Sequence, residues 1–227
     1  MMRQLKDKKI FLYIIVFVIL GSINNQSMTN LELFKVKNIN LQGLEVLQKE
    51  NLLNNLDNLK NKNIFKINNN EIKELIFQNN LVEYISIFKK YPSTLDIKIQ
   101  KTKFLANMNM NGDYFLIGTN KKLIQTDFID KKLPMIFGKP SIENFFELKD
   151  ILDEAKINLS IIKRFYYYHS SRWDLEFNNG DTIKLPINNI KEALRIYFLI
   201  HDLEKFNNID VFDFRVNKQL IVNEFKK

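Results

Sequence analysis

The sequence begins with a basic segment followed by an uncharged apolar run. Residues 1–9 contain four Lys and Arg side chains against one Asp, and residues 10–23 read IFLYIIVFVILGSI. A helix over these 14 residues is about 21 Å long, shorter than the ~30 Å hydrocarbon core of a bilayer. Such a length is typical of a signal-peptide core or of a short anchor whose flanking lysines reach the headgroups.

The residues after the run contain no small-residue pattern of the kind that signal peptidase cleaves. We therefore expect an uncleaved signal-anchor over residues 10–23, with residues 1–9 in the cytoplasm because positive charge stays on that side. The rest of the chain then lies outside the inner membrane, in the periplasm. The absence of cysteine is compatible with an oxidising compartment.

Composition removes several classes of enzyme. Without cysteine there is no disulfide framework, no thiolate zinc site and no thiol nucleophile. The two histidines, His169 and His201, are too few for a histidine metal site, and none of the six glycines lies in a phosphate-cradling loop. We expect neither a metal nor a cofactor.

The net charge of +8 raises the question of nucleic-acid binding. Only five of the 34 basic residues are arginines, although arginine is the favoured phosphate ligand. Basic residues interleaved with aromatic ones do not form a block anywhere in the sequence. Nucleic acid is therefore not an expected partner.

Residues 31–103 have the pattern of a small α+β module. Alternating or helical apolar spacing predicts a strand within 33–44, a helix over 52–59, a second helix after Asn68, and strands over 81–88 and 95–99. Asn68 with Glu71 forms a predicted capping box. The order β-α-α-β-β predicts a three-stranded sheet with both helices on one face.

Residues 104–227 are predicted to be a β-rich domain with an antiparallel sheet and flanking helices. Strands are expected at 105–110, 114–118, 161–168, 173–177, 182–185, 211–215 and 220–222, with residues 133–138 as an irregular bend. Helices are expected over 144–156 and after Asn189, where Glu192 completes a second predicted capping box. Asn179-Gly180 is the strongest hairpin turn.

The sequence contains one weak candidate for a catalytic pair. Asp174 and Glu176 are two residues apart on a predicted strand, so both project to one face, as in a glycosidase pair. A solvated strand face is the favoured interpretation, because such a pair needs an enclosing pocket. His201 on an apolar helical stripe is interpreted as a core or rim residue. We expect no enzymatic activity.

The last predicted strand is a candidate binding surface. Over residues 218–225, Leu220 and Val222 share one face and Ile221 takes the other. If this strand lies at a sheet edge, its free N–H and C=O groups can pair with an incoming strand. The alternative is that these residues only complete the core.

Motifs along nearly the whole chain resemble those of the bacterial cell-division protein family FtsQ (DivIB). Three of them resemble its POTRA domain: Asn63-Ile64-Phe65, Leu81-Val82-Glu83 and the segment from Lys90 to Leu95. The later motifs resemble its β domain in the same order: residues 112–117, Leu133-Pro134 through Gly138, Arg172-Trp173-Asp174-Leu175, Asn179-Gly180, Leu185-Pro186 and Asp213-Phe214-Arg215. Phe104 departs from the family, which usually has proline there.

The resemblance implies a non-enzymatic divisome scaffold of the inner membrane, located at the septum among other divisome membrane proteins. Its fold would be α+β, with an N-terminal membrane helix at 10–23 held by lipid, a POTRA domain at 31–103 and a β domain at 104–227. In the family, the C-terminal edge strand takes up a segment of FtsB, which is coiled to FtsL. The positions that match this contact are Val216, Lys218, Gln219, Leu220, Ile221 and Phe225, with Arg172 as a rim contact.

A proline in place of Ile221 should remove a ladder donor and disrupt partner binding. In the POTRA-like unit, residues 82–88 are the candidate edge for a second partner. Other functions stay open: a different POTRA-bearing component of envelope assembly or secretion, a periplasmic wall hydrolase, or a released periplasmic binder.

Overall fold

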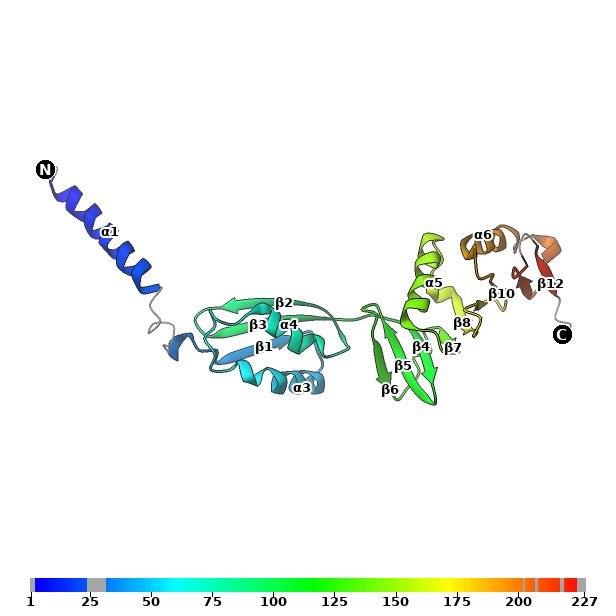
Figure 1. Cartoon of the computed structure of the whole chain (residues 1–227), viewed down its shortest axis with the longest axis horizontal. Helices are drawn as coiled ribbons and strands as arrows, with labels where there is room; N and C mark the ends of the chain where they lie inside the picture. Colours follow the sequence, from blue (N-terminus) through cyan, green and yellow to red (C-terminus); the bar gives the residue numbers. More distant parts are fainter. Residues whose placement is uncertain (1–2, 24–31, 202, 207, 217–218, 224–227) are drawn as a thin grey trace. The chain divides into compact units, whose positions relative to one another are not determined.

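The structure, a computed structural model, describes residues 3–23, 32–201, 203–206, 208–216 and 219–223. The chain divides into two compact units, Met1–Lys101 and Thr102–Lys227, here called unit 1 and unit 2. Figure 1 shows the helices and strands of both. The predicted contact residues Lys218 and Phe225 lie outside the described residues.

Helix α1 extends over Arg3–Ile23 and includes the apolar run. Side chains from Ile10 to Leu20 are exposed, with Phe17 at 78%. Within the described part of the chain, no helix is both long enough and apolar enough to cross a membrane. The anchor over residues 10–23 therefore stays a prediction.

Unit 1 confirms the predicted β-α-α-β-β order. Its elements are β1 (Asn38–Gln42), α3 (Val46–Leu56), α4 (Asn69–Phe77), β2 (Val82–Lys90) and β3 (Thr94–Lys101), with short 3₁₀ turns η1 (Glu32–Phe34) and η2 (Asp57–Leu59). The sheet order is β1-β3-β2, and β1 runs parallel to β3. Both helices pack on one apolar face, since a single core cluster joins Leu52 and Leu56 to Ile72, Ile76 and Ile97.

The first predicted capping box forms only in part. The Asn68 side chain caps α4 by accepting a hydrogen bond from the Asn70 amide at 3.0 Å. Glu71 accepts instead from Nζ of Lys62 at 2.6 Å. The prediction that Glu71 completes the capping box was therefore wrong, because Lys62 from the preceding loop competes for its carboxylate.

Unit 2 is built on a nine-stranded sheet in the order β12-β11-β10-β9-β8-β7-β4-β5-β6. The strands are β4 (Phe104–Met110), β5 (Asp113–Gly118), β6 (Leu123–Thr126), β7 (Met135–Phe137), β8 (Ile162–Tyr167), β9 (Trp173–Phe177), β10 (Thr182–Lys184), β11 (Val211–Asp213) and β12 (Ile221–Asn223). The helices are α5 (Ile142–Glu154) and α6 (Ile190–Ile200), with the 3₁₀ turns η3 (Leu159–Ile161) and η4 (Glu204–Phe206).

The prediction of an antiparallel sheet was wrong in three places. The pairs β4–β7, β7–β8 and β10–β11 are parallel. Parallel neighbours need a long crossover, and here α5 connects β7 to β8 while α6 connects β10 to β11. The sheet is therefore mixed.

The segment predicted as an irregular bend contains strand β7. Ile136 is fully buried and lies between β4 and β8, opposite Met108 and Phe165. Gly138 ends the strand with φ at +96°, and a Cβ there would lie 2.2 Å from the carbonyl oxygen of Tyr167. Three residues are too few to show a period, which is why the pattern was missed.

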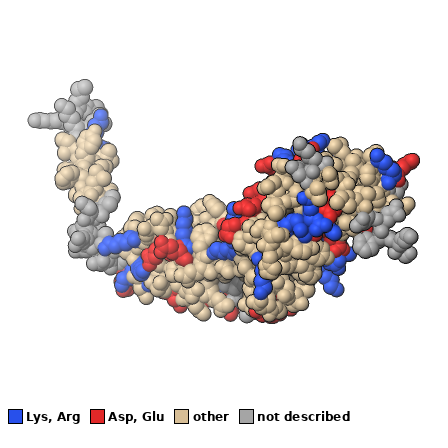
Figure 2. Space-filling view, turned by 45° about the vertical axis from the view of Figure 1, so that its right-hand side comes forward, with Lys and Arg blue, Asp and Glu red and all other residues tan. Residues whose placement is uncertain are grey.

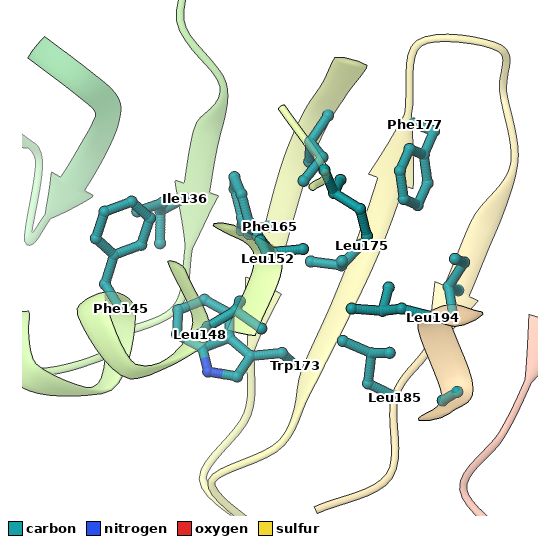
Figure 3. Close-up of a cluster of buried hydrophobic side chains, with 14 of the residues drawn as sticks. Ile136, Phe145, Leu148, Leu152, Phe165, Trp173, Leu175, Phe177, Leu185 and Leu194 are labelled. Carbon is teal, nitrogen blue, oxygen red and sulfur yellow. The ribbon is translucent and has the colours of Figure 1, made fainter. Parts of the chain in front are cut away.

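The core of unit 2 lies between the sheet and its two helices. Figure 3 shows Phe145, Leu148 and Leu152 of α5 and Leu194 of α6 packed over strands β8 and β9. Trp173 is 4% exposed and contacts Phe165 edge-to-face at 6.1 Å between ring centroids. Trp173 is thus a core residue.

The second predicted capping box was wrong. Asn189 precedes α6 with a left-handed φ of 63°, and its side chain makes no capping hydrogen bond. The Glu192 carboxylate accepts from Arg195 Nη2 at 2.6 Å instead. A capping side chain normally comes from a residue with extended φ and ψ, and Asn189 is left-handed instead, a conformation that Asn adopts more readily than most residues.

Candidate partner-binding edge

Strand β12 is the end strand of the nine-stranded sheet. It pairs antiparallel with β11 through Val211–Asn223, Phe212–Val222 and Asp213–Ile221. Among the described residues, no strand pairs with its other side. The predicted terminal strand therefore lies at a sheet edge.

The direction of the backbone groups in β12 follows from its neighbours. Asp210 and Phe214 flank β11. The carbonyl of Asp210 accepts from the Thr182 amide, and the Phe214 amide donates to the Lys184 carbonyl, so the backbone groups of even-numbered residues in and beside β11 face β10. Val211 and Asp213 then face β12 and form the hydrogen-bonded pairs. The alternation leaves the N–H and C=O of Val222 directed at the open edge.

The side chains of the edge divide between the core and the surface. Leu220 is partly buried and packs against the unit 2 core. Ile221 is 45% exposed and Val222 36% exposed, although β-branched apolar residues are usually inside. Leu220 therefore fits the alternative that residues of this strand complete the core, whereas Ile221 and Val222 leave apolar surface for a partner.

A groove next to the edge brings together four of the predicted contact residues. Its volume is about 890 Å³. Arg172, Val216, Gln219 and Leu220 line it, and so do several residues that the sequence reasoning missed: Ser170, Pro186, Ile187, Asn188, Asn189, Glu192, Ala193, Ile196, Phe214 and Arg215. Ile187 is 59% exposed, and the available sequence signal was an isoleucine directly after Leu185-Pro186, outside every predicted strand and helix.

Arg172 is held by two contacts. Its Nε lies 3.3 Å from Oδ1 of Asp174, and its guanidinium lies over the Tyr168 ring at 4.4 Å from the centroid. The Arg172 side chain keeps 21% exposure, so it can still contact a partner at the rim. Burial raises the pKa of Asp174, although Arg172 and Tyr168 work against that shift.

Asp213 and Arg215 fix the chain as it leaves β11. The Arg215 amide donates to Oδ1 of Asp213 at 3.0 Å, and its Nε donates to the same oxygen at 2.8 Å. Burial alone would raise the pKa of Asp213, but the hydrogen bonds from Arg215 outweigh it and lower the pKa. An acid and a base two apart on a strand share a face, and this spacing was the signal for the contact.

The pair Asp174 and Glu176 is not the solvated face that was predicted. Asp174 is only 3% exposed. Burial would raise the pKa of Glu176, but hydrogen bonds from Arg164, Lys163 and Tyr166 lower it to about 2. Asp174 pairs with Arg172 and Glu176 pairs with Arg164, and neither carboxylate lines the groove beside β12 or the second groove at Phe104.

Charges are mixed over the surface. In Figure 2, Lys and Arg atoms occur in small groups among Asp and Glu atoms and uncharged surface. No group of three or more His, Asp or Glu side chains among the described residues could hold a metal ion.

Two family models match the chain along most of its length. The POTRA domain, FtsQ-type, matches residues 34–101, and the C-terminal part of the cell division protein FtsQ/DivIB matches residues 106–215. The chain belongs to the FtsQ/DivIB family. The two matches follow each other in the order of the sequence motifs.

Curated FtsQ and DivIB proteins are similar to this chain. The cell division protein DivIB of Clostridium acetobutylicum is 32% identical over 40% of this chain and 37% of its own length. The cell division protein FtsQ of Rickettsia bellii is 26% identical over 77% of this chain and 66% of its own length. The chain thus spans between about a third and two thirds of these relatives.

A solved structure is also similar. It is the major extracytoplasmic domain of the trans isomer of the bacterial cell division protein DivIB from Geobacillus stearothermophilus. It is 17% identical, covers 48% of this chain and 98% of its own, and has a TM-score of 0.34.

Proposed function

We propose that this FtsQ/DivIB-family chain is a non-enzymatic divisome scaffold that binds a partner strand on β12. Its role is to recruit and position other cell-division proteins at the septum. The partner is an FtsB-like strand from an FtsB–FtsL-like coiled-coil pair. The observation that carries the proposal is the open edge of β12, with the N–H and C=O of Val222 directed outward.

In this proposal the edge of β12 and the groove make different contributions to partner binding. Backbone pairing along β12 supplies affinity that does not depend on the partner sequence. The groove beside it, lined by Arg172, Val216, Gln219 and Leu220, supplies the side-chain contacts that select the partner. The proposal also assigns contacts to Lys218, Ile221 and Phe225.

In this proposal the N-terminal part of the chain anchors the protein in the membrane. The proposal assigns residues 1–9 to the cytoplasm and 10–23 to a single-pass anchor, with domains at 31–103 and 104–227 in the periplasm. An anchor confines the protein to two dimensions and so raises its effective concentration toward other membrane proteins.

The experiment compares prolines at two outward-facing backbone donors. Val222→Pro removes the donor that the proposal gives to the partner strand, and edge strands tolerate proline. Gln125→Pro is the matched control, because β6 is the opposite end strand and the pairing of β6 with β5 leaves the Gln125 amide facing outward. Binding of the FtsB–FtsL-like pair to the full chain is measured by titration.

We expect Val222→Pro to weaken binding at least tenfold and Gln125→Pro to leave it unchanged. Thermal unfolding of both variants should stay close to that of the parent chain. Ile221→Pro removes a donor that faces β11, so it should lower stability together with binding. Full affinity in Val222→Pro would refute pairing at this edge.

A further inference from the structure

A cluster of three aromatic rings, two of them exposed and one partly buried against the core, lies at one end of unit 1. The ring of Phe65 stacks on Tyr91 at 4.7 Å between centroids, and Phe34 meets Phe65 edge-to-face at 5.2 Å. Phe65 is 54% exposed, Tyr91 58% and the neighbouring Leu33 56%. Large apolar side chains gathered on a surface mark an interaction site. We call Leu33, Phe34, Phe65 and Tyr91 the aromatic patch.

Backbone pairing places the patch where the chain begins its first strand. The Ile64 amide donates to the Phe34 carbonyl at 2.9 Å, and the Lys37 amide donates to the Ser93 carbonyl at 2.9 Å. Because β1 is parallel to β3, residue 38 lies at the same end of the sheet as the turn between β2 and β3. Lys101, where the chain leaves unit 1, pairs with Val82 at the other end.

The three segments that form this end are basic. Residues 32–37, 60–66 and 89–93 contain two, three and two lysines, against Glu32 as their one acidic residue. Several of these lysines are held by exposed ion pairs, such as Lys62 with Glu71 at 2.6 Å. Such pairs contribute little, so phosphate groups can compete for the lysines.

The patch is close in sequence to the exposed apolar helix. Ten residues separate Ile23 from Phe34, so an extended tether spans about 40 Å at most. Aromatic side chains prefer the headgroup level of a bilayer, and clustered lysines are attracted to anionic lipids. We propose that the aromatic patch docks unit 1 onto the anionic membrane surface in which α1 is anchored. This inference rests on the anchor in the proposed function.

The test uses the full chain in vesicles of phosphatidylglycerol and phosphatidylethanolamine. The chain has no cysteine, so a single Lys66→Cys gives a unique site for a nitroxide label beside the patch. Gln42→Cys, an exposed position at the opposite end of β1, carries the control label. We expect oxygen to reach the label at position 66 in preference to a water-soluble nickel relaxant, and the reverse at position 42.

A second variant removes the patch. Phe65→Ser with Tyr91→Ser should return the label at position 66 to water without changing the unfolding temperature by more than a few degrees. The matched control is Tyr84→Ser, because Tyr84 is 61% exposed and lies near the opposite end of the sheet, paired with Gln100. It should leave the label in place.

The outcomes separate this inference from the anchor. A chain that floats with the vesicles but keeps both labels in water overturns the docking and leaves the anchor standing. A chain that does not float overturns the anchor and the docking together. If the patch variant lowers binding of the FtsB–FtsL-like pair while the label at position 66 is in water, the patch binds protein and the inference is wrong.

Discussion

On the polar face of the nine-stranded sheet, Glu176 accepts from Nη1 of Arg164 at 2.7 and 2.8 Å and from the Tyr166 hydroxyl at 2.9 Å. Its side chain keeps 15% exposure. These donors stabilise the ionised form more than burial disfavours it. The carboxylate is therefore a structural anion, and its low pKa is a contribution to folding.

The stabilisation from ionised Glu176 decreases as the pH falls. The pKa of Glu176 falls from 4.5 to about 2 in the folded chain, so its stabilisation is present above pH 5 and is lost as the pH falls toward 2. We expect Glu176→Gln to lower the free energy of unfolding by about 2 kcal/mol at pH 7, and by little near pH 2. Denaturant unfolding at several pH values measures the difference.

The control for this prediction is an exposed glutamate. Glu192 is paired with Arg195 on the surface of α6, and its side chain is 54% exposed. Glu192→Gln should change stability little at any pH. An equal loss in both variants would contradict the assignment of Glu176 as a structural anion.

At the scale of elements, the alternating strands and striped helices were predictable. Leu95, Ile97 and Ile99 pointed one way in the sequence, and all three are buried in β3. Parallel pairing and the short β7 were not predictable, because a three-residue strand has no period and strand direction depends on crossovers. The burial of Asp174 was missed because a polar residue in an alternating strand suggests solvent, and only the tertiary contacts reveal Arg172 and Tyr168 over it.

Part of the candidate site was predictable as well. A strand over residues 220–222 was predicted from position and alternation, and β12 lies at the end of the sheet. The alternation separated Ile221 from Val222, whereas both side chains are exposed. The groove did not, because it joins residues 186–189 and the α6 side chain Ile196 to the segment after β11. Residues so far apart in the sequence meet only through the parallel pairing of β10 with β11.

The two faces of strand β7 should differ in their contribution to stability. Ile136 is fully buried between two strands, so Ile136→Ala should lower the free energy of unfolding by about 2–5 kcal/mol. Phe137 on the opposite face is 43% exposed and stacks on Tyr166 at 5.3 Å, so Phe137→Ala should cost about 1 kcal/mol. Equal losses, measured by denaturant unfolding, would show that the segment behaves as a loop.

The whole molecule contains an apolar N-terminal helix, two separate cores and, at β12, the sheet edge proposed to bind the partner. Unit 1 and unit 2 each have their own hydrophobic cluster. Neither core depends on the apolar helix α1 for the side chains that form it. Binding and anchoring should therefore be separable by mutation.

Two lysines in the apolar run test the tether. Ile14→Lys with Val18→Lys places two charges near the middle of the run, each costing about 3 kcal/mol in a bilayer. The full chain should leave the carbonate-resistant membrane fraction and lose its midcell band as a fluorescent fusion, while it still binds the FtsB–FtsL-like pair in solution. Ile14→Leu with Val18→Leu is the control. Retention of the lysine variant in the membrane would contradict the anchor.

The most direct test of the central claim is hydrogen exchange at two adjacent amides of β12. In the free chain, the amide of Ile221 should be protected by pairing with β11, and the amide of Val222 should exchange rapidly. On binding the FtsB–FtsL-like pair, Val222 should gain protection while Ile221 changes little. If Val222 still exchanges rapidly in a saturated complex, the partner does not add a strand to this edge and the proposed mechanism is wrong.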